Sequence, residues 1–375
     1  MISQERLIQE FMELVRVDSE TGNERQIADV LKDKFSALGL TVIEDDSKER
    51  TGHGAGNLFV TWPAVEGVSA PKMLFTCHMD TVVPGQNIQP TLGADGWITS
   101  DGSTILGSDD KAGLAALFEA IRVIQEDNLA HGQLQFVITA GEESGLLGAR
   151  NMDPSHLDAD FGFALDSNGE VGAIAVAAPT QAKVTMQIFG KSAHAGVNPE
   201  DGISAIQVAS KAISAMKLGR IDNETTANIG KFAGGGPTNV VCDHVQLDAE
   251  ARSIVQEKVE RQIASMREAL ETTTREYGAE SEFRSEIIYP AFSFNEHDPV
   301  VKLAERAITS LGLTPRLFAS GGGSDANVFN GLKVPTVNLA VGYEHIHTTK
   351  ERIKAADIVK VAELVVAIVK ESVQG

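Results

Sequence analysis

The chain has 375 residues, more than one hydrophobic core commonly supports, so we expect two domains. Hydrophobic residues make up 42% of it and charged residues 22%, and no segment has the composition of a long disordered tail. The formal net charge of −20 argues against nucleic acid and anionic membranes as partners, because most of the surface would repel them.

Cysteine content and the N-terminal segment favour a cytoplasmic protein. The two cysteines, Cys77 and Cys242, are too few for a disulfide framework, and each lies in an apolar stretch that predicts a buried strand and a free thiol. Residues 1–16 alternate charged and apolar residues at helical spacing and lack the features of a signal peptide. No apolar run approaches the length of a membrane span.

In the N-terminal and C-terminal parts of the chain, predicted helices alternate with predicted strands. Apolar residues recur at helical spacing over residues 7–15 and again over residues 27–38. Short apolar runs that predict buried strands follow at residues 72–77, 134–140, 161–165 and 334–341. Helices separate several of these runs, which predicts an α/β fold with a mainly parallel mixed sheet flanked by helices.

The middle of the chain has a different order of elements, β-α-β-β-α-β. We predict them at residues 183–189, 202–217, 226–232, 240–252, 255–277 and 281–289. This order matches the ferredoxin-like α+β unit. We therefore predict an inserted domain of residues 179–289 and an outer domain formed by residues 1–178 and 290–375.

A histidine and an aspartate two residues apart end the first predicted strand of the outer domain. Residues two apart in an extended chain point to the same side, so His78 and Asp80 can approach each other. A histidine that ligates metal usually donates its second ring N–H to a carboxylate. A capped surface histidine at a strand end is the plain alternative.

Further acidic residues occur at a helix start and at a strand end. Asp109 opens a predicted helix, where helix capping would also explain an acidic residue. Glu142 and Glu143 follow the strand at 134–140, and adjacent carboxylates repel unless a cation or solvent neutralises them or one has a raised pKa. A bound metal ion would resolve both cases.

Two more candidates follow other predicted strands. Asp166 ends the strand at 161–165, although a turn-forming aspartate would look the same. His347 follows the strand at 334–341, and His345 is a rival ligand two residues away. Either histidine could instead be an ordinary loop residue.

The joint placement of these motifs favours a metal site. They all follow strands or open helices at one edge of the predicted sheet, where open α/β sheets bind their ligands. Two histidines with several carboxylates suit zinc, cobalt or manganese, and the absence of clustered cysteines argues against a structural zinc or iron–sulfur centre.

Taken in order along the chain, the motifs resemble the zinc metallopeptidases that include peptidase T, carboxypeptidase G and the aminoacylases, with peptidase T the most similar branch. Three motifs of the inserted segment also match, at residues 190–196, 199–206 and 235–241. The resemblance implies a zinc-peptidase-like catalytic domain and an inserted lid or dimerisation domain. It also implies a cytoplasmic exopeptidase, an aminopeptidase or tripeptidase that acts on short peptides.

The resemblance also assigns roles to the site residues. One divalent cation, zinc before cobalt or manganese, would be held by His78 and Asp166, and a second by Glu143 and His347. Asp109 would bridge the two cations and Asp80 would orient His78. Glu142 would be the general base that takes a proton from the attacking water. His347 is preferred to His345 because Glu351 follows it at the family's spacing.

Three residues of the inserted segment complete the implied site. His194 would stabilise the oxyanion, from the same chain or from the second subunit of a homodimer. Asn239 and Arg252 match positions that bind the polar backbone or the carboxylate of the substrate. Peptidase T has an arginine where this chain has Gly321, so one bidentate carboxylate binder is missing here.

Two alternative functions remain open from the sequence. The same kind of site hydrolyses N-acyl amino acids and other small amides, which would leave the chemistry unchanged and alter the substrate. A non-catalytic metal-binding scaffold would be expected to lack a base or a bridging ligand, whereas Glu142 and Asp109 are both present.

Overall fold

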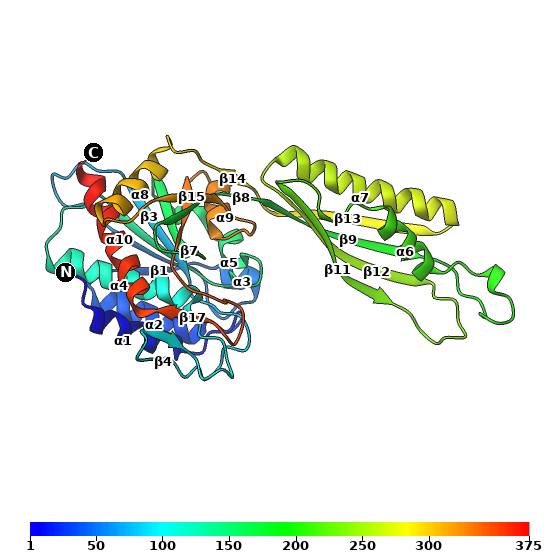
Figure 1. Ribbon diagram of the computed structural model, residues 1–375, viewed down its shortest axis with the longest axis horizontal. Helices are drawn as coiled ribbons and strands as arrows, with labels where there is room; N and C mark the ends of the chain where they lie inside the picture. Colours follow the sequence, from blue (N-terminus) through cyan, green and yellow to red (C-terminus); the bar gives the residue numbers. More distant parts are fainter. Residues whose placement is uncertain (375) are drawn as a thin grey trace. The chain divides into compact units, whose positions relative to one another are not determined.

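A nine-stranded sheet with a parallel centre organises the first of two units in the computed structural model, which describes residues 1–374 (Figure 1). Unit 1 consists of Met1–Ala177, Phe294–Ser320 and the chain from Ser324 onward. Unit 2 consists of Ala178–Ser293 and Gly321–Gly323. Each unit has a hydrophobic core of its own.

The strands of the large sheet follow the order β1-β2-β6-β3-β7-β16-β8-β14, and β15 also pairs with β8. Their bounds are Val42–Glu44 (β1), Leu58–Trp62 (β2), Met73–His78 (β3), Leu134–Thr139 (β6), Phe161–Ser167 (β7), Ala173–Ala178 (β8), Phe292–Ser293 (β14), Arg316–Ala319 (β15) and Thr336–Ala340 (β16).

Strands β6, β3, β7 and β16 run parallel to one another at the centre of the sheet. On either side of them, β2 pairs antiparallel with β6 and β8 pairs antiparallel with β16, and β1 pairs antiparallel with β2 at the edge. Every residue of β3 and β6 is buried, which explains why these strands read as continuous apolar runs. The predicted mainly parallel mixed sheet is therefore confirmed. Its four central strands end at one edge, where the candidate site residues lie.

Helices flank this sheet, as predicted. Helix α4 packs on β3 and β7 and against α1 and α10, while α9 packs on β7 and β16. The bounds of the helices are Gln4–Val15 (α1), Arg25–Ala37 (α2), Ser47–Thr51 (α3), Ser108–Glu126 (α4), Leu147–Arg150 (α5), Pro299–Ser310 (α8), Asp325–Gly331 (α9) and Ala355–Gln374 (α10).

A second, three-stranded sheet lies in unit 1, in the order β17-β5-β4. Its strands are Thr91–Leu92 (β4), Trp97–Thr99 (β5) and Arg352–Lys354 (β17). β17 pairs antiparallel with β5, with Arg352 opposite Thr99. Strand β17 begins directly after the segment that carries His347.

Unit 2 is an antiparallel sheet in the order β10-β11-β12-β9-β13, with α6 and α7 packed against it. The order of its long strands is the ferredoxin-like one that the β-α-β-β-α-β pattern predicts. The bounds are Thr180–Phe189 (β9), Ala205–Ala215 (α6), Gly219–Arg220 (β10), Thr225–Gly234 (β11), His244–Ser253 (β12), Gln256–Tyr277 (α7) and Glu280–Tyr289 (β13).

One detail of the predicted inserted segment is wrong. Strand β12 begins at His244 rather than at residue 240, so Cys242 precedes the strand and is partly exposed instead of being a buried core thiol. Cys77, on β3, is free and buried as predicted. Of the apolar pair before Cys242, Val240 forms only an isolated bridge with His194 and Val241 lies in irregular chain, which local hydrophobicity does not distinguish from a strand.

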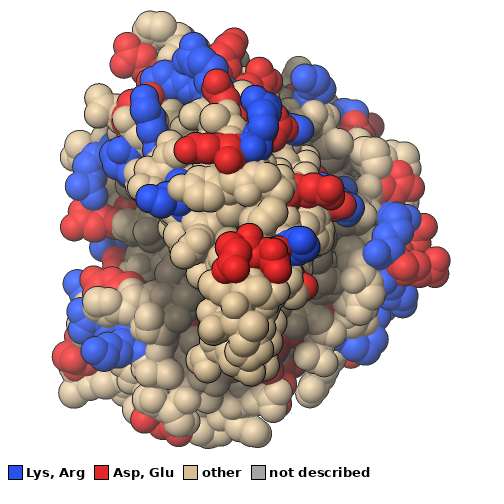
Figure 2. All heavy atoms as spheres, turned by 90° about the vertical axis from the view of Figure 1, so that its right-hand side faces the viewer, with Lys and Arg blue, Asp and Glu red and all other residues tan. Residues whose placement is uncertain are grey.

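Charged side chains of both signs are interspersed on the face drawn in Figure 2. The net charge of −20 is therefore not gathered into one continuous acidic area on that face. Among the described residues, no helix combines the length and the hydropathy needed to cross a membrane.

Candidate metal centre

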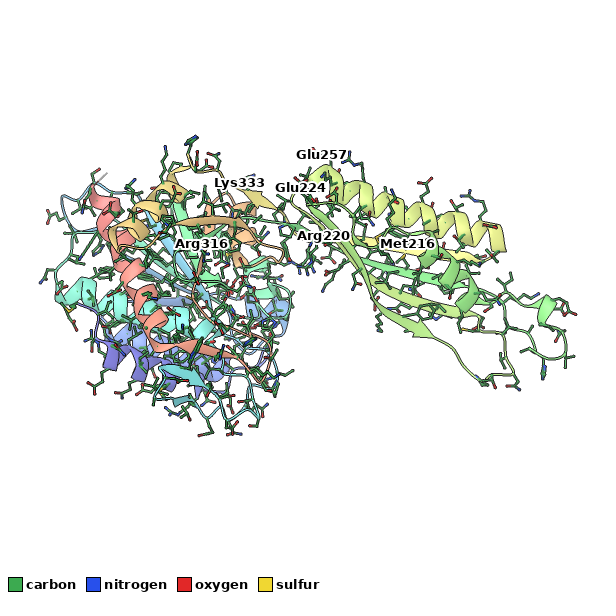
Figure 3. The ribbon with its side chains drawn as sticks, in the orientation of Figure 1. Met216, Arg220, Glu224, Glu257, Arg316 and Lys333 are labelled. Carbon is green, nitrogen blue, oxygen red and sulfur yellow. The ribbon has the colours of Figure 1, made fainter. Side chains whose placement is uncertain are left out.

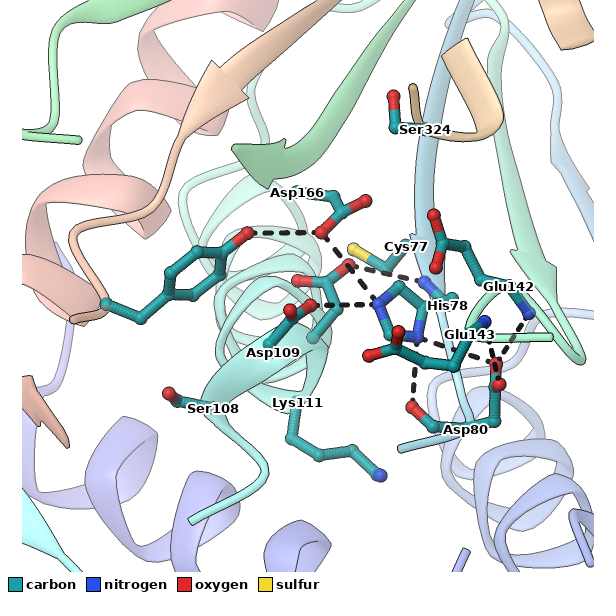
Figure 4. A network of polar contacts seen from close by, with 12 residues as sticks. Cys77, His78, Asp80, Ser108, Asp109, Lys111, Glu142, Glu143, Asp166 and Ser324 are labelled. Atoms are coloured by element: carbon teal, nitrogen blue, oxygen red, sulfur yellow. Dashed lines mark hydrogen bonds and ion pairs between the residues drawn. The ribbon is translucent and has the colours of Figure 1, made fainter. Parts of the chain in front are cut away.

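Carboxyl ends of neighbouring strands bring the predicted ligands of unit 1 together, and Figure 4 shows His78, Asp109, Glu143 and Asp166 among them. His78 is the last residue of β3, and Asp166 is the next-to-last residue of β7. Glu142 and Glu143 lie in the turn after β6, while His347 lies in the loop after β16. Asp109 lies at the start of α4, in a non-helical conformation.

These side chains form two groups that share Asp109, and His78, Glu142 and Glu143 form a third group. His78 Nε2 lies 2.9 Å from Asp109 Oδ1 and 3.8 Å from Asp166 Oδ1. His347 Nε2 lies 3.2 Å from Asp109 Oδ2 and 3.0 Å from Glu143 Oε1. Each group places three ligand atoms within 4.8 Å of one another. His345, the rival of His347, belongs to none of these groups among the described residues.

Asp80 uses its backbone and its side chain for different partners. The Nδ1 atom of His78 lies 2.9 Å from the Asp80 backbone oxygen and 3.5 Å from carboxylate Oδ1. The carboxylate itself accepts hydrogen bonds from the backbone N–H groups of Glu142 and Glu143, at 3.0 and 3.2 Å. Asp80 thus connects β3 to the turn after β6.

The turn that carries Glu142 requires glycine at its first position. Gly141 has φ +67°, and a Cβ atom there would meet the His53 ring at 2.5 Å. The His53 Nε2 atom lies 2.9 Å from Ser144 Oγ, and the Ser144 hydroxyl donates to the Gly141 carbonyl at 2.9 Å. His53 therefore packs against both ends of this turn.

Glu351 fixes the start of α4 relative to the loop of His347. Its carboxylate is buried and accepts hydrogen bonds from Leu106 N, Gly107 N and Asp109 N, at 2.9, 2.9 and 3.1 Å. The Ser108 hydroxyl donates to the same carboxylate at 2.6 Å. One side chain therefore satisfies the free N–H groups before α4 and holds the backbone of Asp109.

Asp166 is held by two residues from the β16 region. The side chain of Asn338 accepts from Asp166 N at 3.0 Å and donates to the Asp166 carbonyl at 2.8 Å. The Tyr343 hydroxyl donates to Asp166 Oδ1 at 3.1 Å. The backbone and the carboxylate of Asp166 are both fixed as a result.

Burial and mutual repulsion raise the pKa of several carboxyl groups at the centre. Burial is the main cause for Glu142, Glu143 and Asp166, and neighbouring carboxylates raise the pKa of each further. Asp109 differs, because hydrogen bonds from His347 and His78 outweigh its burial and lower its pKa. Hydrogen bonds to Asp109 and Glu143 raise the pKa of His347 to about 10.

The donor set fits divalent cations. Carboxylates outnumber the two histidines, and all of them lie at the end of a buried sheet where solvent screens their repulsion poorly. Imidazole nitrogens and carboxylate oxygens are ligands of zinc, cobalt and manganese. Two cations sharing Asp109 would neutralise this charge.

Further buried polar residues surround the ligands, and the sequence alone predicts no role for them. Asp325 accepts a hydrogen bond from Thr139, the last residue of β6, and burial raises its pKa to about 6. Lys111 donates to Ser19 Oγ at 2.7 Å, and burial lowers its pKa to about 8. Asn338 was detectable as a polar residue within an apolar strand. Asp325 and Lys111 could have been found as charged residues close to motifs already singled out: Asp325 lies just after the glycine run of residues 321–323, and Lys111 lies two residues after Asp109.

His194 and Asn239 lie near each other in unit 2. The backbone N–H of Ala195 donates to the Asn239 carbonyl at 2.9 Å, and His194 forms an isolated bridge with Val240. The N–H of Gly196 donates to His194 Nδ1 at 3.1 Å, so the neutral imidazole carries its proton on Nε2. The exposed His194 side chain can therefore donate a hydrogen bond through Nε2.

Arg252 is paired within unit 2. Its Nε and Nη2 donate to the two carboxylate oxygens of Glu250, at 2.9 and 3.0 Å, and the pair raises its pKa against the opposing effect of burial. No described contact joins Arg252 to His194 or Asn239. A Cβ atom at Gly321 would meet nothing within 4 Å, so a side chain has space there.

The chain is similar to known proteins over its whole length. A model of peptidase family M20/M25/M40 matches residues 74–371. The structure of aminopeptidase PepT from Bacillus cereus ATCC 10987 is 59% identical, covers 100% of both chains and has a TM-score of 0.93. A tripeptidase structure from Staphylococcus aureus subsp. aureus mu50 is 49% identical with a TM-score of 0.97, again over 100% of both chains.

A curated relative has a comparable level of identity. Uncharacterized protein YqjE of Bacillus subtilis (strain 168) is 55% identical over 372 residues, which cover 99% of this chain and 100% of the relative. Sequence and fold therefore agree with these proteins from end to end.

Proposed function

The chain belongs to peptidase family M20/M25/M40, and from this premise we propose that it is an aminopeptidase that hydrolyses tripeptides with two zinc ions. Family membership confirms the resemblance to the peptidase T group, and with it a metallopeptidase of the exopeptidase type. The observation that carries the proposal is the pair of ligand groups that share Asp109, beside Glu142.

We assign the residues of unit 1 as follows. His78 and Asp166 would hold one cation, Glu143 and His347 the other, and Asp109 both. Asp80 would orient His78 through its backbone oxygen. Bound cations would lower the pKa of a water molecule and polarise the peptide carbonyl.

Glu142 would handle the proton of the reaction. Its carboxylate takes one proton from the attacking water and later gives it to the leaving amine, so the C–N bond breaks and one water is consumed. A general base works best with a pKa near the working pH, and burial raises the pKa of Glu142 in that direction. The hydrogen bond from Glu142 N to Asp80 fixes the backbone from which this side chain extends.

The roles of the unit 2 residues remain proposals. We assign His194 to the oxyanion through its Nε2 proton, and Asn239 and Arg252 to the polar groups of the peptide. The partner of Arg252, Glu250, would have to share it with a substrate carboxylate. A cytoplasmic location and a homodimer formed through residues 179–289 complete the proposal. Light scattering on the purified protein tests the dimer.

A substrate panel with metal analysis tests the proposal. The purified protein is assayed by mass spectrometry on Leu-Gly-Gly, on a dipeptide and on an N-acetyl amino acid, before and after chelation and after zinc is restored. We expect Leu and Gly-Gly as products, loss of turnover on chelation and recovery with zinc. Release of acetate without peptide cleavage would favour the N-acyl hydrolase, and a zinc-loaded protein inactive on the whole panel would favour a scaffold.

A further inference from the structure

His347 is the exposed member of the ligand set. Its side chain is 49% exposed, whereas the side chains of His78, Glu143, Asp109 and Asp166 are between 1% and 12% exposed. Packing therefore contributes little to the position of this imidazole. The conformation of the surrounding loop must place it instead.

That loop has an unfavourable backbone. His345 has φ +57° and His347 has φ +61°, in the left-handed region that L-residues with a Cβ atom rarely adopt. Such conformations persist where the surrounding structure imposes them. The loop therefore needs anchors at its ends to keep His347 in place.

The ends of the loop are joined by Glu344 and Arg352. Glu344 N donates to the Arg352 carbonyl at 2.8 Å, and Arg352 N donates to the Glu344 carbonyl at 3.0 Å. The Arg352 guanidinium also donates from Nε and Nη2 to Glu344 Oε2, at 2.9 and 2.7 Å. We call residues 344–352 the His347 hairpin.

Trp97 supports the Arg352 side of this hairpin. The Arg352 guanidinium lies over the indole ring, 4.1 Å from its centroid, and the Lys354 ammonium lies 4.9 Å from the same ring. Strand β17 pairs with β5, so the backbones of these residues are also joined. A flat guanidinium can stack on the ring and bind a carboxylate at once, which lysine cannot reproduce.

We infer that Arg352 is a positioning residue: stacked on Trp97 and paired with Glu344, it sets the affinity of the metal site formed by Glu143 and His347. It contacts none of the five ligands among the described interactions and acts through the hairpin. His78 and Asp166 of the other proposed site lie at strand ends outside the hairpin, and the shared ligand Asp109 is held by the buried carboxylate of Glu351, whose hydrogen bonds do not involve Arg352. The inference rests on the two-zinc centre of the proposed function.

Zinc titration of the metal-free protein against a chromophoric chelator tests this inference, with no activity assay. Outer partners of metal ligands commonly change affinity 10–100-fold. Arg352 acts one step further out, through the hairpin, so we expect Arg352→Ala to weaken one of two zinc equivalents by about 10-fold, the lower end of this range, and to leave the other unchanged. The double variant His347→Ala/Arg352→Ala should bind its remaining zinc ion with the same affinity as His347→Ala alone.

Arg316→Ala is the matched control. Arg316, labelled in Figure 3, lies on β15 of unit 1 and forms an exposed pair with Glu170 at 2.8 Å. This variant should bind both zinc equivalents like the wild type. Circular dichroism checks the fold of each variant, and Glu344→Gln, which removes the carboxylate partner alone, decides the question if Arg352→Ala does not fold.

Three outcomes would overturn the inference. The positioning role would be wrong if folded Arg352→Ala bound two zinc equivalents with wild-type affinity. The same result for Glu344→Gln would count if Arg352→Ala did not fold. Equal weakening of both equivalents, or the same loss in Arg316→Ala, would show a general effect on the fold. A wild-type protein that binds fewer than two equivalents would overturn the two-zinc proposal and this inference with it.

Discussion

Asn338 holds the backbone of Asp166 on both sides, and it does so from a neighbouring strand. Its side chain occupies the N–H and the carbonyl of Asp166 at a point where β7 and β16 shift register. Asn338 is 5% exposed, so water cannot readily replace these bonds. A buried backbone group without a partner costs about 1–3 kcal/mol.

We predict that Asn338→Ala lowers the free energy of unfolding by about 2–4 kcal/mol, because it leaves two backbone groups without partners. Urea unfolding followed by circular dichroism measures the change. Asn295→Ala is the control, since Asn295 accepts a hydrogen bond from His297 N in an exposed turn and should cost less than about 1 kcal/mol. Equal effects of the two substitutions would contradict the account.

The metal-ligand candidates could be predicted from the sequence more completely than the residues that hold them in place. His78, Asp109, Glu143, Asp166 and His347 stood at predicted strand ends or a helix start, and the structure brings these five together. Asn338, Tyr343 and Asp325 contact the site only because distant strands and helices meet there. Residue spacing along the chain does not encode such contacts.

The elements of unit 1 are joined by ion pairs as well as by the core. Glu44 on β1 accepts hydrogen bonds from Arg25 and Lys32 on α2, at 2.7–3.1 Å, and from Gly56 N at 3.2 Å. Burial opposes the charged form of Glu44, but the positively charged side chains of Arg25 and Lys32 outweigh burial and lower the pKa of Glu44 from 4.5 to about 2. Charged Glu44 therefore stabilises the folded state.

The sign of the pH dependence follows from the lowered pKa. The contribution of Glu44 is fully present above pH 4.5, the unfolded value, and is lost as the pH falls towards 2. We predict that Glu44→Gln lowers the free energy of unfolding by about 1 kcal/mol at pH 7, a value reduced for the partial exposure of Arg25 and Lys32.

Urea unfolding at pH 7, 4 and about 2.5 measures this difference, which should shrink towards zero at the lowest pH. Glu49→Gln, a substitution in the neighbouring helix α3, is the control. A difference that stays constant between pH 7 and pH 2.5 would show that Glu44 acts through its shape and not through its charge.

Strand and helix types were predictable, and their ends were less so. The buried strands β3 and β6 had unambiguous apolar runs, and α7 was predicted within one residue of its observed start. The predicted strand β12 began too early, because residues 240 and 241 are apolar but lie outside the strand, in an isolated bridge and in irregular chain. Hydrogen bonding between segments sets such ends, and one segment's composition does not report it.

The whole molecule contains two separate cores, and all the proposed metal ligands lie in unit 1. A ligand that binds only the folded state stabilises it by about 2.7 kcal/mol at a concentration of 100 Kd. We therefore expect two thermal transitions in calorimetry, of which zinc raises the one that belongs to unit 1. A zinc-induced shift confined to the unit 2 transition would contradict the placement of the site.

Assigning the two transitions requires a variant in each core. Leu270→Ala reduces the core of unit 2, and Leu117→Ala reduces that of unit 1. Each should lower the midpoint of its own transition, since such changes typically cost about 2–5 kcal/mol. The zinc-sensitive transition should be the one that Leu117→Ala lowers.

The fold class of the whole chain was predictable because its two parts have different patterns: alternating buried strands and helices at the ends, and a β-α-β-β-α-β order between them. The substrate was less predictable, since the residues proposed to bind it lie in unit 2 and Gly321 stands where peptidase T has an arginine. Arg252 matched a substrate-binding position, and its pairing with Glu250 appears only in the folded unit.

Hydrolysis of Leu-Gly-Gly by Glu142→Ala, with zinc counted in the same samples, separates the role of the proposed base from that of the proposed ligands. We predict two zinc equivalents in the wild type and the variant, and a turnover number at least about 100-fold lower in the variant, because the proton acceptor is gone while the ligands remain. Turnover at the wild-type rate in a zinc-loaded Glu142→Ala protein would contradict the account.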